Sequence, residues 1–112
     1  MPVFKNDTQE AKEIAPGVFR KIATLENMLV ATIEFTGGPM EEPDEPHSHP
    51  HEQVSYVAEG SLYVFIGDEK QMLTEGDLFL IPSNAPHCIQ TLSERVKLVD
   101  TFTPVREDFF QD

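Results

Sequence analysis

Short segments in which apolar and polar residues alternate follow one another along most of the chain, and turn-forming pairs separate them. The pairs are Gly37-Gly38, Glu59-Gly60, Gly67-Asp68, Glu75-Gly76, Ser83-Asn84 and Ser93-Glu94. The segments between them are rich in β-branched and aromatic residues, which predicts strands over 18–24, 28–35, 53–58, 62–66, 70–74, 78–81, 87–92 and 96–102. None keeps a helical period, so the pattern predicts an all-β sandwich or small barrel.

The first residues of the chain give a weaker signal. Residues 6–14 are compatible with a short N-terminal helix or with an extended arm, and the pattern does not separate the two. A length of 112 residues suits one small domain that can bury a core without disulfide bonds. We therefore expect a single domain over residues 1–112.

The charge balance argues against two classes of partner. Twenty acidic and eight basic side chains give a formal net charge of -12, which repels nucleic acid and anionic lipid headgroups. Cys88 is the sole cysteine, so an intramolecular disulfide is excluded. Residues 1–30 contain no apolar stretch long enough for a signal peptide or a membrane span. We expect a cytoplasmic protein that binds neither nucleic acid nor membrane.

Three of the four histidines lie within five positions, in the stretch PHSHPHEQ. In an extended segment His47 and His49 point to the same side, about 7 Å apart along the chain, and can converge on one ion. His51 has the same parity, but Pro50 precedes it, and we expect it beside the site or at the surface. Such loops are also often plain solvated surface. Two imidazoles need further ligands, and His87 is the remaining histidine. Cys88 follows His87, and we expect it to pack rather than to ligate.

The spacing of these residues resembles the cupin family. Gln53 and Gly60 follow His47 and His49 as in the first cupin motif, although that motif usually has glutamate in place of Gln53. GDLFLIPSNAPHCIQT resembles the second motif and contains His87, with Asn84 where glycine and Thr91 where asparagine are usual. The resemblance implies a cupin β-barrel, or jelly roll, with a motif core over 47–91 and a C-terminal strand and tail over 96–112.

HSHPHEQVSYVAEG and DTFTPVREDF together are similar to the pectin-degradation cupins that linearise unsaturated uronates. That resemblance implies one divalent metal ion (Ni, Fe, Mn, Zn or Co), held by His47, His49, Gln53 and His87. It also implies catalytic roles for Asp100, Phe102 and Arg106. The implied partner is a small anionic sugar, and cupins of this size are often homodimers, which we also expect here.

The C-terminal strand is compatible with this chemistry. Leu98, Asp100 and Phe102 share one face, so Asp100 points into the barrel if its apolar neighbours do. An inward carboxylate can act as a base, Arg106 can bind a substrate carboxylate through its planar guanidinium, and Phe102 can form a wall of the pocket. Taken without the resemblance, the residues favour a surface acid for Asp100 and a surface ion pair for Arg106. A non-enzymatic cupin that binds a small molecule and a cupin dioxygenase are the alternatives.

Overall fold

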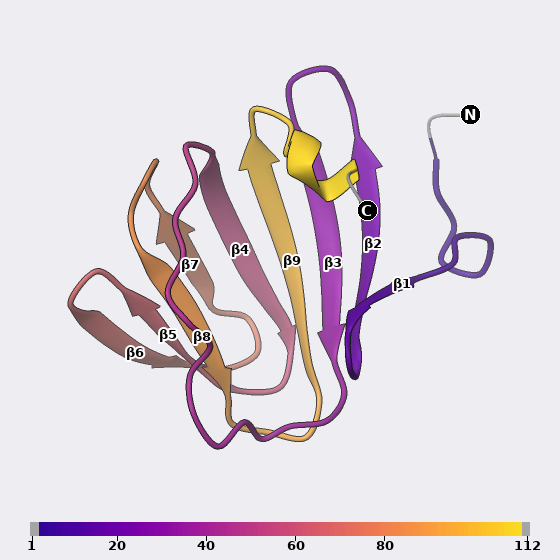
Figure 1. Cartoon of the computed structure of the whole chain (residues 1–112). Coiled ribbons are helices and arrows are strands. Elements are labelled where there is room, and N and C mark those ends of the chain that lie inside the picture. Colours follow the sequence, from indigo (N-terminus) through magenta and orange to yellow (C-terminus); the bar gives the residue numbers. More distant parts are fainter. Residues whose placement is uncertain (1–2, 111–112) are drawn as a thin grey trace.

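A computed structural model describes residues 3–110, which form nine antiparallel strands and one short 3-10 helix (Figure 1). The strands are β1 (Lys12–Ala15), β2 (Val18–Thr24), β3 (Leu29–Phe35), β4 (Glu52–Glu59), β5 (Leu62–Ile66), β6 (Glu69–Leu73), β7 (Leu78–Ile81), β8 (His87–Thr91) and β9 (Val96–Thr103), and the helix is η1 (Glu107–Phe110). No helix between residues 3 and 110 has the length and apolar character needed to cross a bilayer. Residues 1–2 and 111–112 of the predicted domain and tail lie outside the described residues.

The strands form two sheets that face each other, as expected for a barrel. One sheet has the order β1-β2-β3-β9-β4-β7 and the other has the order β6-β5-β8. The segment between β3 and β4 runs beside β8, because backbone N–H groups of Met40, Asp44 and His47 donate to carbonyls of Thr91, Ile89 and His87. In Figure 1 this segment crosses the open side between the two sheets. It brings the histidine stretch against the start of β8.

Alternation along the central strands fills the interior. On β4, the side chains of Gln53, Ser55 and Val57 are buried, whereas Val54 and Tyr56 remain about two-fifths exposed. Strand β9 alternates in the same way, with buried residues at every second position from Val96 to Phe102. Fully burying one such aliphatic side chain contributes about 1.5–3 kcal/mol. The buried faces of β4 and β9 therefore hold the two sheets together.

The predicted strands are confirmed, with boundaries that differ by at most one residue at either end. The N-terminal segment is an arm rather than a helix, since residues 6–9 form a turn and 12–15 form β1. Strand β1 pairs with β2 across Pro16-Gly17, and Gly17 has a positive φ of 75°. A proline–glycine pair is a standard turn signal. It is the sequence feature that marks this additional hairpin.

Two turns explain residues of the cupin-like motifs. Gly60 has a φ of 87°, and a Cβ built there would lie 2.2 Å from the carbonyl oxygen of Arg95, so this turn requires glycine. Asn84 stands where glycine is usual and has a φ of 66°. Asparagine is among the few residues that adopt this left-handed conformation readily. The departure from the motif therefore preserves the turn that leads into His87.

Candidate functional site

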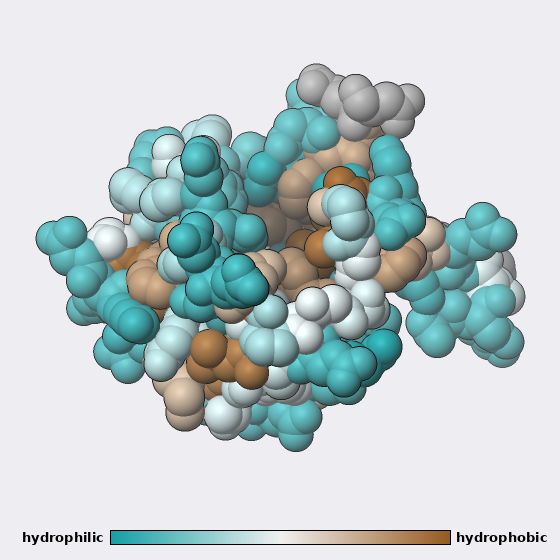
Figure 2. Space-filling view, turned by 60° about the horizontal axis from the view of Figure 1, so that its bottom comes forward, coloured by the Kyte–Doolittle hydropathy of each residue, from teal (hydrophilic) through white to brown (hydrophobic). Residues whose placement is uncertain are grey.

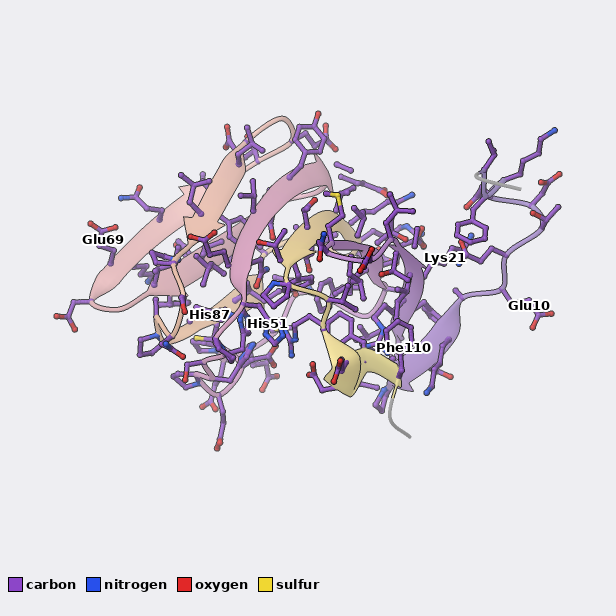
Figure 3. The ribbon with its side chains drawn as sticks, turned by 90° about the horizontal axis from the view of Figure 1, so that it is seen from above. Glu10, Lys21, His51, Glu69, His87 and Phe110 are labelled. Carbon is purple, nitrogen blue, oxygen red and sulfur yellow. The ribbon has the colours of Figure 1, made fainter. Side chains whose placement is uncertain are left out.

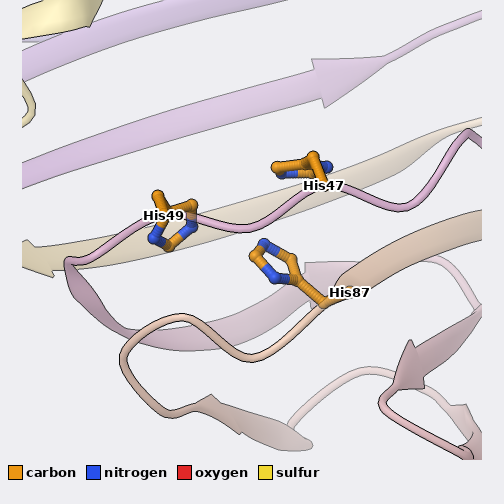
Figure 4. Close-up of side chains that lie close together, drawn as sticks. All are labelled: His47, His49 and His87. Carbon is orange, nitrogen blue, oxygen red and sulfur yellow. The ribbon is translucent and has the colours of Figure 1, made fainter.

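Three histidine side chains gather between the two sheets. His47 and His49 come from the segment before β4, and His87 begins β8 (Figure 4). Their nearest ring nitrogens all lie within 4.8 Å of one another. His47 and His87 exchange both backbone hydrogen bonds, at 3.0 and 2.9 Å, so a small β-bridge fixes one histidine opposite the other. The three imidazoles are close enough to bind one ion.

Backbone carbonyls orient two of these rings. The Nδ1–H of His49 donates to the carbonyl of His51 at 3.0 Å, and the Nδ1–H of His87 donates to the carbonyl of Ala85 at 2.9 Å. Each bond leaves the lone pair of Nε2 free. Burial lowers the pKa of His49 and of His87, which favours the neutral imidazole. Neutral imidazole is the form that binds metals.

Gln53 adds an oxygen to the same place. Its Oε1 lies 3.2 Å from Nε2 of His49, and both atoms present lone pairs when His49 is neutral with its proton on Nδ1. Two facing lone pairs repel each other unless a cation binds to both. This arrangement fits a divalent ion with three nitrogen ligands and one oxygen ligand, so His47, His49, Gln53 and His87 could hold one together.

Asp100 is connected to this cluster through Ser55. The Ser55 hydroxyl lies 2.5 Å from Oδ1 of Asp100 and 2.9 Å from Nε2 of Gln53. Asp100 is 4% exposed, and burial raises its pKa from 3.8 to about 6, although the Ser55 hydrogen bond and the charge of Arg106 act in the opposite direction. The prediction that Asp100 points inward is thus confirmed. A carboxyl with a pKa near neutrality can both accept and return a proton.

Arg106 lies at the end of the same interior, beside two aromatic rings. The centre of its guanidinium is 5.0 Å from the ring centroid of Phe102 and 4.4 Å from that of Phe109. Phe102 in turn packs edge-on against His49, with 5.7 Å between centroids. The guanidinium binds Asp108 through two hydrogen bonds, from Nε to Oδ1 at 2.9 Å and from Nη2 to Oδ2 at 2.5 Å. A carboxylate of η1 therefore occupies one edge of the guanidinium, the edge formed by Nε and Nη2.

These groups surround a cavity of about 360 Å³. Its polar lining includes His47, His87, Gln53, Asp100 and Arg106, and most of the remaining wall is apolar. Figure 2 shows a hollow in which hydrophobic side chains are visible between hydrophilic rims. The volume is at the low end of the range for small-molecule sites. It suits a ligand of about the size of one sugar.

A second cavity, of about 630 Å³, lies next to the first and is lined by His49, His51, Arg106 and Asp108 among others. Arg106 lines both cavities. The face of Arg106 that carries Asp108 is therefore accessible from the second cavity. This arrangement places the arginine at the boundary between the interior and the outside.

Two residues near the cluster are set apart from it. His51 lies at a bend, its carbonyl accepts from Nδ1–H of His49, and its ring lies beside the His49 ring, with 5.6 Å between the centroids. Its ring nitrogens are not part of the close group formed by His47, His49 and His87. His51 and His87 are labelled in Figure 3. Cys88 is buried, and this burial, together with Asp44, raises the pKa of its thiol. A protonated thiol is a poor ligand. The acidic residues 41–46 are exposed, as expected for a solvated loop.

Sequence reasoning missed Ser55 and Asp108. Ser55 shares the inward face of β4 with Gln53, and its register partner on β9 is Asp100, so the alternation of β4 carried a signal for it. Asp108 follows Arg106 by two residues, and sequence alone did not show that its carboxylate would turn back onto the guanidinium. Six of the seven predicted site residues line the cavity of about 360 Å³, and the seventh, His49, lines the adjoining one.

Comparisons with known proteins agree with this geometry. The family model for the cupin domain matches residues 33–102. The pectin degradation protein KdgF of Dickeya dadantii is 36% identical over 108 residues, which cover 95% of this chain and 96% of that protein. The structure of KdgF from a Halomonas species superposes with a TM-score of 0.86 at 30% identity, over 95% of this chain and 96% of that one. An RmlC-like cupin from Shewanella frigidimarina gives a TM-score of 0.85 at 33% identity, over 95% and 93% of the two chains.

Proposed function

The chain belongs to the cupin family, and we propose that it is a metal-dependent enzyme that opens the ring of unsaturated monouronates released from pectin or alginate. One observation carries the proposal: a single cavity is lined by two of the three clustered histidines, a buried carboxyl and an arginine, in a chain that resembles a pectin degradation protein. A cavity of about 360 Å³ suits a ligand of about the size of one sugar. We therefore propose that the substrate is a monosaccharide of the kind that a lyase releases.

The proposed reaction is an isomerisation by proton transfer. An unsaturated uronate in its pyranose form has a hydroxyl on the anomeric carbon and a carbon–carbon double bond next to the ring oxygen. Loss of the hydroxyl proton forms a carbonyl at the anomeric carbon, and the bond from that carbon to the ring oxygen breaks. The ring oxygen leaves with the bonding electrons as an enolate. Addition of a proton to the enolate carbon then gives the open-chain ketone, so no oxidant or reductant is needed.

We assign proton removal to Asp100. Its carboxyl lines the cavity, and its pKa of about 6 leaves it mostly ionised at neutral pH while keeping it basic enough to take a proton. Ser55 donates a hydrogen bond to Oδ1, which leaves Oδ2 to act on the substrate. After the first step the protonated Asp100 can supply the proton that the enolate requires.

We assign substrate binding to Arg106 and Phe102. A guanidinium binds a carboxylate through two parallel hydrogen bonds, and Phe102 and Phe109 hold its plane. Asp108 already accepts from Nε and Nη2, so the substrate carboxylate either replaces the Asp108 carboxylate there or binds the remaining N–H groups of the guanidinium. Phe102 is buried beside His49 and forms the wall between the candidate metal ligands and the arginine.

When bound, a divalent ion held by His47, His49, Gln53 and His87 supplies an electrophile, and it keeps its full double charge because all four side chains are neutral. Glutamate in place of Gln53 would cancel part of that charge. The protein as a whole carries a formal net charge of -12, so a local positive centre assists the capture of an anionic sugar.

The decisive test is to incubate purified protein with the unsaturated monomer made by a pectate or alginate lyase, without oxygen. Loss of the ultraviolet absorbance of the conjugated double bond is expected. Oxygen consumption in aerobic samples, without this loss under anaerobic conditions, would instead identify a dioxygenase. Saturable binding without turnover would identify a binding protein. Either result would reject the ring-opening proposal.

We further propose that the protein is a cytoplasmic homodimer. Strand β7 is at the edge of its sheet, and its Leu78 and Leu80 are 60% and 64% exposed. They pair in register with Tyr56 and Val54 of β4, which are also exposed, so four apolar side chains form one outward patch. A second copy packed against this patch would cover it. Light scattering after size exclusion should give twice the chain mass for the wild type and the chain mass for Leu80→Glu.

A further inference from the structure

Ser55 is fully buried at the centre of the site. Its exposure is 0%, and it lies on β4 directly across from Asp100 on β9. Its hydroxyl has two partners, the amide nitrogen of Gln53 at 2.9 Å and the carboxyl of Asp100 at 2.5 Å. Burying a hydroxyl destabilises the fold unless the hydroxyl both donates and accepts a hydrogen bond.

The direction of these hydrogen bonds follows from the chemistry of the three groups. A hydroxyl has one proton to donate, and an ionised carboxylate can only accept. The Ser55 proton therefore goes to Asp100. The Ser55 oxygen must then accept from Gln53, and the amide NH₂ is the part of Gln53 that can donate to it.

The amide orientation decides which atom of Gln53 faces the histidines. With its NH₂ on Ser55, the Gln53 side chain presents Oε1 to His49, at 3.2 Å from Nε2. If the amide turned over, the NH₂ would face the histidines, and an amide NH₂ has no lone pair available for a metal. The Ser55 hydroxyl thus decides between two arrangements. In one, Oε1 of Gln53 is available as a fourth ligand beside the three histidines; in the other, the Gln53 NH₂ faces the histidines and cannot bind a metal.

We propose that Ser55 is a positioning residue that fixes the Gln53 amide so that Oε1 faces the metal position. Asp100 determines the direction of the Ser55 hydroxyl, and the hydroxyl determines the direction of the amide. This inference rests on the metal site of the proposed function, but it concerns a residue that touches neither the ion nor the substrate.

The test compares Ser55→Thr with Ser55→Val, because these side chains have nearly the same volume and differ by the hydroxyl. Ser55→Ala, which adds no volume, accompanies them in case the larger residues disturb folding. Each metal-depleted protein is titrated with Zn²⁺ against a chromogenic chelator, and its thermal unfolding is recorded without metal. Loss of an orienting group beside a metal ligand typically weakens metal binding about 10–100-fold. We expect that loss for Val and Ala, and an affinity near that of the wild type for Thr.

The spectrum of bound Co²⁺ gives a second readout. Replacing or losing the Gln53 oxygen as a ligand should change the visible ligand-field bands in Ser55→Val and Ser55→Ala, whereas Ser55→Thr should keep the wild-type spectrum. Unchanged Zn²⁺ affinity and an unchanged Co²⁺ spectrum in both Val and Ala would overturn the role of Ser55 and leave the proposed function standing. If the wild-type protein bound neither ion, the metal site of the proposed function would itself be wrong.

Discussion

Replacing Asp100 by asparagine should make the protein more stable and at the same time inactive. Asp100 is buried within the barrel, and burial raises its pKa from 3.8 to about 6. The folded protein therefore binds this proton more strongly than the unfolded chain does. The ionised form, which the proposed reaction needs, is the form that the fold tolerates less well.

The magnitude follows from the difference in pKa. At about 1.4 kcal/mol for each pKa unit, the difference between 3.8 and about 6 means that ionised Asp100 destabilises the folded protein by about 3 kcal/mol. Because the folded-state pKa is the higher one, this destabilisation is absent below the unfolded value, grows as pH rises between the two values, and is complete above about pH 7. About half of it is present at pH 5. Asparagine has the same shape, keeps an oxygen to accept from Ser55, and carries no charge.

The assay is urea unfolding of metal-depleted wild type and Asp100→Asn at about pH 8 and about pH 5. Metal is removed because a nearby cation would lower the pKa of the carboxyl. The variant should gain up to about 3 kcal/mol at the higher pH and about half as much at the lower one. Asp7→Asn, at an exposed position in the N-terminal turn, is the matched control and should change little at either pH.

Activity completes the test. On metal-loaded protein, loss of a general base should lower kcat for ring opening about 10²–10⁴-fold, with metal content unchanged. Equal unfolding free energies of variant and wild type at both pH values would refute the claim that the buried carboxylate is unfavourable. Ring opening by Asp100→Asn at a rate near that of the wild type would remove Asp100 from the proposed mechanism.

Three further predictions concern the other site residues. His49→Ala and His87→Ala should each lose stoichiometric metal by elemental analysis, and full retention in both would reject the ligand assignment. Gln53→Glu should keep or tighten metal binding but weaken the affinity for the anionic substrate, because it removes one unit of positive charge; isothermal titration with a non-reacting uronate would detect this, and unchanged affinity would contradict it. Arg106→Lys should raise KM with most of kcat kept, since a lysine cannot form the two parallel bonds. Asp108→Asn should lower KM, because it removes a competing carboxylate from the guanidinium. An unchanged KM in both variants would show that Arg106 does not bind the substrate.

The sequence by itself determined the strands and the inward direction of their key residues. Alternation with a period of two and turn pairs such as Glu59-Gly60 act over a few residues, so they could be recognised without the fold. The same alternation predicted that Asp100 points into the barrel between Leu98 and Phe102. The motif spacing predicted that His87 shares a site with the histidine stretch, although it did not predict which atoms of these residues touch.

The tertiary structure decided which groups touch. His47 meets His87 through a backbone bridge between segments forty residues apart, and Ser55 connects Gln53 to Asp100 because β4 pairs with β9 in that register. His51 has the parity of the other two histidines, yet it lies at a bend after Pro50, and its ring packs beside that of His49 without joining the group of close ring nitrogens. The carboxylate of Asp108 accepts two hydrogen bonds from Arg106, a pairing that the sequence did not predict. Hydrogen-bond direction and burial depend on neighbours that are distant in sequence, so local patterns do not contain them.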